Sequence, residues 1–154
     1  QIAAGLGLVS AIAGRLEFKP LANNSAVIDD SYNASPSSFR AAIDVLANRA
    51  GRKILVMGDM AELGEDSINM HSEVGAYALE AGIDALYAVG EQSASACAAF
   101  GGNHFQSREL LATAVAQELS RASADNRPVT FLVKGSRSAG MEKIVEHLIT
   151  RGNT

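Results

Sequence analysis

The stretch "AVIDDSYNASPSSF", residues 26–39, joins the pattern of a buried strand to the pattern of a capped helix. Residues 25–29 are a short apolar run, which is typical of a strand covered on both faces of a parallel sheet. Ser35 is placed to cap the helix that follows, and Pro36 occupies its first turn. The polar side chains between strand and helix are Asp29, Asp30, Tyr32 and Asn33. Turn chemistry explains such a cluster, and so does a binding site, and the stretch alone leaves both interpretations open.

The alternation of strand and helix patterns continues along the whole chain. We predict strands at residues 15–19, 25–29, 53–58, 85–90, 103–107 and 129–135. Apolar stripes with helical spacing predict helices after Pro36, from Ser67, after the cap Ser107 and around residues 144–149, with a weaker pattern in the Ala-rich residues 92–100. The stripe predicted for the second helix is Met70, Val74, Tyr77 and Ala81, with Gly82 ending it. The predicted fold class is α/β: a Rossmann-like, doubly wound, mostly parallel sheet with helices on both faces.

Composition narrows the class of protein. The chain has 154 residues, the size of one domain, with 47% hydrophobic and 19% charged residues. A net charge of −4 without any run of Lys or Arg argues against a nucleic-acid partner. No apolar stretch is long enough for a membrane span, and the first residue is Gln, so we expect a piece of a longer cytoplasmic protein. The single cysteine, Cys97, excludes an internal disulfide and is expected to be a small buried side chain.

Candidate site residues follow the predicted strands, because ligands bind outside the carboxyl ends of an open parallel sheet. These polar positions include Asp30, Asp59, Gly90, Lys134, Gly135, Ser136, Arg137 and Ser138. The turn at residues 134–136 suits an anion, since backbone N–H groups and a helix N-terminus meet there. It is not a Walker A loop, and no Gly-x-Gly-x-x-Gly follows a strand. The three histidines show no metal-ligand spacing, so no metal site is predicted, and His71 is expected to be structural.

Several strings carry a resemblance to a known family. At residues 14–17 ("GRLE"), 27–43 ("VIDDSYNASPSSFRAAI"), 56–64 ("VMGDMAELG") and 133–146 ("VKGSRSAGMEKIVE"), the chain resembles the C-terminal domain of Mur ligases. Mur ligases are ATP-dependent amino-acid-adding enzymes of peptidoglycan precursor synthesis. The strings are most similar to the branch that adds D-alanyl-D-alanine to UDP-N-acetylmuramoyl-tripeptide. On this resemblance, residues 1–13 are the tail of a central ATPase domain or a linker, and residues 14–154 are the C-terminal domain.

The resemblance also implies roles for individual residues. Arg15 is expected to reach the ATP phosphates, Asp30 to accept hydrogen bonds from the ribose hydroxyls, and Tyr32 and Asn33 to lie near the adenine. The loop at residues 134–136 is expected to face the cleft where an acyl phosphate meets the amine. Lys134 is expected to act there as a catalytic cation, and Gly135 and Ser136 as substrate contacts. The implied partners are ATP, the tripeptide and dipeptide substrates and the rest of the same polypeptide. Mg²⁺ is implied as well, with its ligands in the central domain outside this sequence.

Two other interpretations fit parts of the same pattern. A phosphoacceptor receiver domain, which is a signalling switch, also has paired acids after one strand, an Asp after a later strand and a Lys after the last. Here these residues would be Asp29 and Asp30, Asp59, and Lys134. Against it, this chain has an extra strand before the acid pair, and Gly90 stands where a receiver has a hydroxyl residue. The third interpretation is a nucleotide-binding domain without a catalytic partner, against which the missing glycine fingerprint counts.

Overall fold

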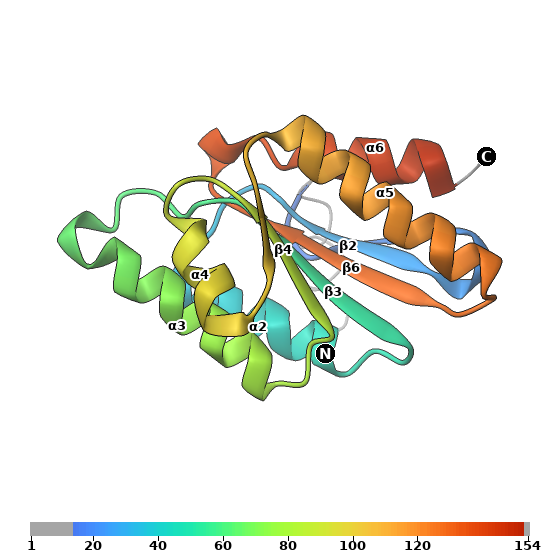
Figure 1. Ribbon diagram of the computed structural model, residues 1–154, viewed down its shortest axis with the longest axis horizontal. Helices are drawn as coiled ribbons and strands as arrows, with labels where there is room; N and C mark the ends of the chain where they lie inside the picture. Colours follow the sequence, from blue (N-terminus) through green and yellow to red (C-terminus); the bar gives the residue numbers. More distant parts are fainter. Residues whose placement is uncertain (1–13, 153–154) are drawn as a thin grey trace, which may run out of the picture.

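A six-stranded sheet forms the centre of the molecule, in a computed structural model that describes residues 14–152 (Figure 1). The strand order is β1-β2-β6-β3-β4-β5, and the pairings from β2 to β5 are parallel, whereas edge strand β1 is antiparallel to β2. The strands are β1 (Glu17–Pro20), β2 (Ala26–Asp30), β3 (Arg52–Met57), β4 (Ala85–Val89), β5 (Asn103–Phe105) and β6 (Val129–Lys134). The helices are α2 (Pro36–Ala47), α3 (Ser67–Glu80), α4 (Ser93–Phe100), α5 (Arg108–Ala124) and α6 (Glu142–Gly152), with short 3₁₀ turns η1 (Ala22–Asn24), η2 (Gly64–Asp66) and η3 (Arg137–Ala139). The predicted element order and fold class are confirmed.

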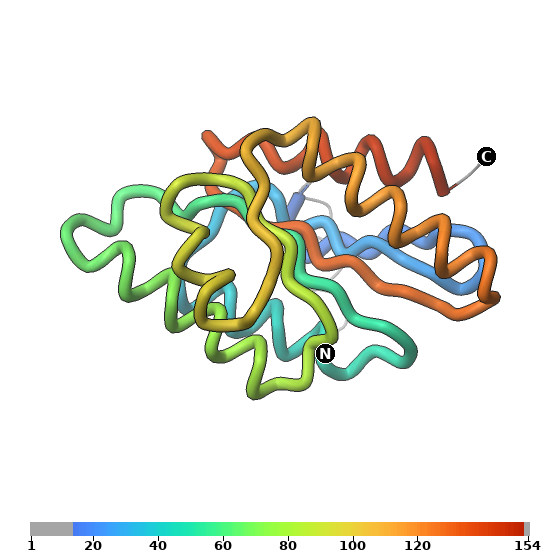
Figure 2. Tube along the Cα trace, viewed as in Figure 1, coloured from blue at the N-terminus to red at the C-terminus, as the bar shows by residue number. Residues whose placement is uncertain are grey.

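Segments far apart in the sequence lie side by side at the centre of the sheet. Figure 2 shows β2, in blue, next to β6, in orange, with β3 on the other side of β6. In the parallel register, Asp30 lies opposite Lys134, and Lys134 lies opposite Met57. The carboxyl ends of these three strands are therefore level with one another. They form the edge at which a parallel sheet binds ligands.

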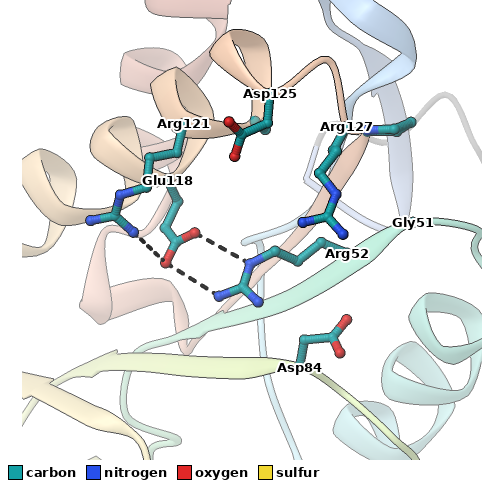
Figure 3. A pocket seen from close by; sticks show the side chains of 9 residues that line it. Gly51, Arg52, Asp84, Glu118, Arg121, Asp125 and Arg127 are labelled. Carbon is teal, nitrogen blue, oxygen red and sulfur yellow. Dashed lines mark hydrogen bonds and ion pairs between the residues drawn. The ribbon is translucent and has the colours of Figure 1, made fainter.

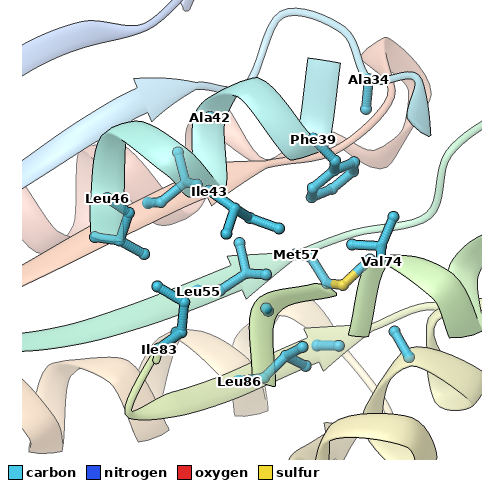
Figure 4. Close-up of a cluster of buried hydrophobic side chains, with 14 of the residues drawn as sticks. Ala34, Phe39, Ala42, Ile43, Leu46, Leu55, Met57, Val74, Ile83 and Leu86 are labelled. Carbon is cyan, nitrogen blue, oxygen red and sulfur yellow. The ribbon is translucent and has the colours of Figure 1, made fainter. Parts of the chain in front are cut away.

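Helices cover both faces of the sheet and separate two hydrophobic cores. Helices α2, α3 and α4 pack on one face, and Figure 4 shows Phe39 and Ile43 of α2 turned toward Leu55 and Met57 of β3. Helices α5 and α6 pack on the other face, where Leu111 and the other buried residues of these helices meet the opposite side chains of the same strands. Since β2 and β6 are buried along their whole length, their near-continuous apolar sequences are those of central parallel strands.

The predicted helix caps are present. The Ser35 hydroxyl accepts a hydrogen bond from the Ser38 amide, and the Ser38 hydroxyl accepts one from the Ser35 amide, so that the two form a capping box ahead of α2. Ser107 caps α5 by accepting from the Leu110 amide. Gly82 follows the last residues of α3 with a left-handed φ of 86°, as expected of a helix-ending glycine.

The face that α3 buries differs from the predicted stripe. Among the predicted residues only Val74 is fully buried, whereas Met70, Tyr77 and Ala81 are partly buried at the margin of the core. The helix instead buries Ser67, His71, Gly75 and Ala78. His71 is structural, as predicted: Nε2 accepts from the Met60 amide at 2.9 Å, and Nδ1 lies 2.8 Å from the Ser67 carbonyl oxygen.

Gly75 is buried because α4 approaches α3 very closely at this point. A Cβ atom on Gly75 would lie 2.2 Å from the carbonyl oxygen of Ala96 in α4. Only a residue without a side chain permits that approach.

Cys97, the next residue of α4, is buried as predicted, and burial raises the pKa of its thiol to about 11. Within residues 14–152, no helix has the length and apolarity that a membrane crossing requires.

Candidate functional site

An ion pair joins the ends of the two central strands β2 and β6. Lys134 Nζ lies 2.7 Å from Asp30 Oδ2 and also donates to the Asn33 carbonyl oxygen at 3.1 Å. The other carboxylate oxygen of Asp30 accepts from the Leu16 amide at 3.1 Å. The Lys134 ammonium lies 5.4 Å from the centroid of the Phe39 ring, and its side chain is only 1% exposed. The pair therefore fixes the turn after β2 against the end of β6.

A cavity of about 380 Å³ opens beside this pair. Its lining consists of Arg15, Leu16, Asp30, Asn33, Ala34, Ser35, Ser38, Ala41 and Lys134. Four of the residues expected from the sequence, Arg15, Asp30, Asn33 and Lys134, thus come together in one place. The start of α2 also lies there, so the positive end of the helix dipole adds to the potential of the same wall.

Two arginines lie close to the Tyr32 ring at this edge of the sheet. The guanidinium carbon of Arg15 is 4.5 Å from the centroid of the Tyr32 ring, and that of Arg137 is 5.4 Å from it. Cation–π attraction of this kind is worth about 0.5–1 kcal/mol per contact at an exposed site. The ring therefore gathers two positive charges: Arg15 lines the cavity, whereas Arg137 and Tyr32 line a second cavity of about 430 Å³. The sequence placed Arg137 at this edge but predicted no role for it.

Asp29 points to the opposite face of the sheet from Asp30, as adjacent residues of a strand must. Its Oδ1 accepts from the amide and the hydroxyl of Ser31, at 3.2 and 2.6 Å, and its Oδ2 lies 3.1 Å from Lys19 Nζ. This carboxylate thus ties edge strand β1 to the turn after β2. Its contacts explain the residue as part of the turn, whereas Asp30 belongs to the cavity.

Tight packing fixes the loop after β6. Gly135 packs on Gly58 at the end of β3: a Cβ atom on Gly135 would lie 3.2 Å from Gly58 Cα. The Ser136 amide donates to the Asp59 carbonyl oxygen at 2.9 Å, and Arg108 Nη1 donates to the Gly140 carbonyl oxygen at 3.1 Å. Lys134, Gly135 and Ser136 are all buried, and the first exposed side chain of the loop is that of Arg137.

Asp59, the residue that a receiver domain would phosphorylate, caps helix α4. Its Oδ1 accepts from the Ser93 amide at 2.8 Å and from the Ser93 hydroxyl at 2.7 Å, and its Oδ2 accepts from the Gln92 amide at 3.3 Å. Gly90, at a φ of 111°, is packed so closely on this carboxylate that a Cβ atom would meet it. A carboxylate that holds three donors is not poised as a nucleophile. The receiver interpretation is therefore not favoured.

A larger cavity, about 530 Å³, lies at the opposite edge of the sheet, where the strands begin. Figure 3 shows Arg52 and Arg121 turned toward the Glu118 carboxylate, and Tyr87 donates to the same carboxylate from β4. Burial, and then this hydrogen bond, raise the pKa of Tyr87 to about 12. Because Arg52 and Arg121 both pair with Glu118, the network serves to hold α5 against β3 and β4.

Comparison with known proteins identifies the family. The sequence profile described as "Mur ligase, glutamate ligase domain" matches residues 14–137, most of the chain. The chain belongs to the Mur ligase family. The UDP-N-acetylmuramoyl-tripeptide–D-alanyl-D-alanine ligase of Escherichia coli is 45% identical over 98% of this Mur ligase chain and 33% of its own length. The Bacillus subtilis protein of the same name is 33% identical over 96% of this chain and 33% of its own length.

Solved structures agree with this Mur ligase assignment. A crystal structure of MurF from Acinetobacter baumannii superposes with a TM-score of 0.82 at 33% identity, over 90% of this chain and 31% of that chain. The MurF ligase from Thermotoga maritima, solved in complex with ADP, has a TM-score of 0.74 at 24% identity, over 91% of this chain and 31% of its own, and shows the shared fold. The Mur ligase chain described here spans about a third of the length of the relatives it matches.

Three features of the site in this Mur ligase domain were not predicted. Neither the Leu16 amide nor the Phe39 ring was expected beside the Asp30–Lys134 pair, and the exposed Arg137 was left without a role. A group of three or more His, Cys, Asp or Glu residues able to hold a metal ion is not found among residues 14–152. The division at residue 13 falls on residues that lie outside the described part of the chain, so the domain boundary stays a prediction.

Proposed function

We propose that this chain is the C-terminal domain of a cytoplasmic, ATP-dependent ligase that joins D-alanyl-D-alanine to UDP-N-acetylmuramoyl-tripeptide. The observation that carries the proposal is the convergence of Arg15, Asp30, Asn33 and Lys134 on one cavity at the carboxyl edge of the sheet. Family membership supports the reaction class, and the names of the relatives support the substrates. A chain of this length supplies one wall of the site, and the rest of the polypeptide supplies the other.

The nucleotide lies against the first part of this wall. A carboxylate offers about four lone-pair positions. Asp30 uses one for the Leu16 amide and one for Lys134, so positions remain for the two ribose hydroxyls. Tyr32 and Asn33 lie beside the adenine: Asn33 lines the cavity, and the exposed Tyr32 precedes it in the turn after β2. Arg15 extends from the start of the domain toward the phosphates, for which its planar guanidinium group is suited.

The reaction proceeds in two displacement steps. A carboxylate oxygen of the tripeptide attacks the γ-phosphorus of ATP, the bond to the bridging oxygen breaks, and ADP leaves with that electron pair. The amine of the dipeptide then attacks the acyl carbon, a carbon–nitrogen bond forms, and phosphate leaves as the amine loses its proton. Both steps need positive charge beside the phosphoryl oxygens and fixed orientation of the two substrates.

The loop at residues 134–136 closes the second part of the wall. Gly135 and Ser136 are proposed as substrate contacts; the Ser136 amide already donates to the Asp59 carbonyl oxygen, so the contact of Ser136 is assigned to its hydroxyl group. The catalytic assignment of Lys134 stays a prediction, and its ammonium group is buried and paired with Asp30. Mg²⁺ accompanies ATP in such reactions, but no acidic cluster in residues 14–152 fits it, so no step here is assigned to a metal held by this chain.

A reconstitution assay tests the proposal. The complete ligase that carries this chain, incubated with ATP, Mg²⁺, the tripeptide nucleotide and D-alanyl-D-alanine, is expected to release ADP, phosphate and one amide-linked product in equal amounts. Mass spectrometry of the product and omission of each substrate in turn identify the reaction. The 154-residue chain alone is expected to ligate nothing. Ligation by the isolated chain, or no product from the complete protein with these substrates, would contradict the proposal.

A further inference from the structure

Two cations, one at the end of β6 and one in the loop after it, differ sharply in what they can reach. Lys134 is 1% exposed, and its ammonium is held by Asp30 and by the Asn33 carbonyl group. The side chain of Arg137, three residues later, is 67% exposed. A buried ammonium that leaves its carboxylate would strand an unpaired buried charge, which is strongly unfavourable. Arg137 moves toward a ligand without that cost.

Arg137 is also close to the other exposed arginine of this edge. The guanidinium groups of Arg15 and Arg137 lie 4.5 and 5.4 Å from the same ring centroid, that of Tyr32, so their central carbons are at most about 10 Å apart. A phosphate group that accepts charge-assisted hydrogen bonds of about 2.8 Å from both guanidinium groups is within reach of such a pair once the side chains rotate. The ring limits how far either guanidinium group strays from the other.

The backbone beneath Arg137 is fixed, whereas its own ion pair is weak. The loop is anchored on both sides, by the Ser136 amide on Asp59 and by Arg108 on Gly140. Arg137 Nη1 lies 3.9 Å from Glu142 Oε1, too far for a hydrogen bond, and that oxygen has no hydrogen-bond partner among the described residues. The two side chains are 67% and 40% exposed, and at this distance the pair holds the arginine only loosely. Arg137 is thus well positioned and still free to bind a ligand.

We propose that Arg137 is a catalytic residue: together with Arg15 it binds the oxygens of the phosphoryl group that passes from ATP to the tripeptide carboxylate. Lys134 is then a positioning residue, which acts through Asp30 and touches neither substrate nor phosphate. Tyr32 holds the two guanidinium groups together beside the nucleotide. This inference rests on the proposed ligase function, and it assigns to Arg137 the positive charge that the sequence led us to expect from Lys134.

The test compares Arg137→Ala and Arg137→Lys with Arg40→Ala in the complete ligase. Arg40 is a matched control, since it too lies over a tyrosine ring, 6.0 Å from the centroid of Tyr77, and pairs with an exposed acid, Glu73. Two rates are measured: full ligation, and exchange of label between ADP and ATP with the tripeptide nucleotide but without the dipeptide. The exchange depends on acyl phosphate formation alone.

Arg137→Ala is expected to lower both rates on the order of a hundredfold, as the loss of one donor to a developing oxyanion does. Arg137→Lys recovers only part of this loss, because a point charge replaces a planar fork, and Arg40→Ala keeps both rates. Normal exchange with impaired ligation in Arg137→Ala would place Arg137 on the dipeptide and overturn the assignment, and so would two unchanged rates. If the wild-type protein itself shows neither activity, the proposed function fails instead. Equal melting temperatures of Arg137→Ala and Arg40→Ala show that a loss of rate is not a loss of folding.

Discussion

The ion pair between Asp30 and Lys134 yields a quantitative prediction about stability. Both side chains are nearly inaccessible, at 10% and 1% exposure, and their charged atoms are 2.7 Å apart. Removing one partner of a buried pair costs about 3–5 kcal/mol, because the other charge stays buried without compensation. Replacing both partners by apolar side chains is often nearly neutral. Asp30 also accepts from the Leu16 amide, so the double replacement loses about 1 kcal/mol more for that hydrogen bond.

A double-mutant cycle measures this coupling directly. Asp30→Ala and Lys134→Met are each expected to lower the free energy of unfolding by about 3 kcal/mol or more, and the double variant by about 1–2 kcal/mol. The chain has no Trp, so urea unfolding is followed by far-UV circular dichroism. The matched control is the exposed pair of Arg40 and Glu73, 3.5 Å apart, for which the coupling is expected below about 1 kcal/mol. Additive losses at Asp30 and Lys134 would refute the argument, since they would show that the two charges do not compensate each other.

Three further predictions concern the packing and ionisation of buried groups. Gly75→Ala is expected to lower the free energy of unfolding by about 2–3 kcal/mol, because the new methyl group meets the Ala96 carbonyl oxygen; an unchanged urea midpoint would mean that α3 and α4 separate easily. His71→Phe fills a similar volume but leaves a buried backbone amide without its acceptor, for a loss of about 1–3 kcal/mol in the same assay. Burial raises the pKa of the Cys97 thiol from 9.0 to about 11, and burial and a hydrogen bond raise the pKa of Tyr87 from 10.0 to about 12. The folded state therefore favours the protonated form of both groups. The contribution of these two groups to stability is therefore expected to be constant below about pH 9 and to fall as the pH rises toward 12, a fall that Cys97→Ala reduces at its lower end.

The sheet and the order of its elements could be predicted from the sequence because the signals are local. Strands β2, β3 and β6 are five or six residues long and each contains an apolar run, and Ser35 and Ser107 mark helix starts by their position alone. The buried face of α3 could not be predicted from apolar spacing. His71 is buried because a backbone amide needs its ring nitrogen, and Gly75 is buried because α4 needs the space.

The contents of the site were predicted in part. That Asp30 and Lys134 lie at one edge follows from strand ends, but their direct contact depends on β2 and β6 being neighbours in register, although 104 residues separate the two side chains. The solvent exposure of Lys134 and Arg137 could not be predicted either, because it too depends on how distant segments pack. The sequence shows two cations three residues apart. Only the fold shows that Lys134 is buried and that Arg137 lies at the surface beside Tyr32.

The central claim is that the edge around Asp30 forms one wall of an ATP site. Its most direct test is the apparent KM for ATP of the Asp30→Ala/Lys134→Met double variant of the complete ligase, in which the buried pair is removed as a unit and the ribose acceptor is lost. We predict a rise in KM for ATP of about tenfold, the equivalent of roughly one charge-assisted hydrogen bond, with the KM for D-alanyl-D-alanine unchanged. A change in the KM for D-alanyl-D-alanine with an unaltered KM for ATP would contradict the claim.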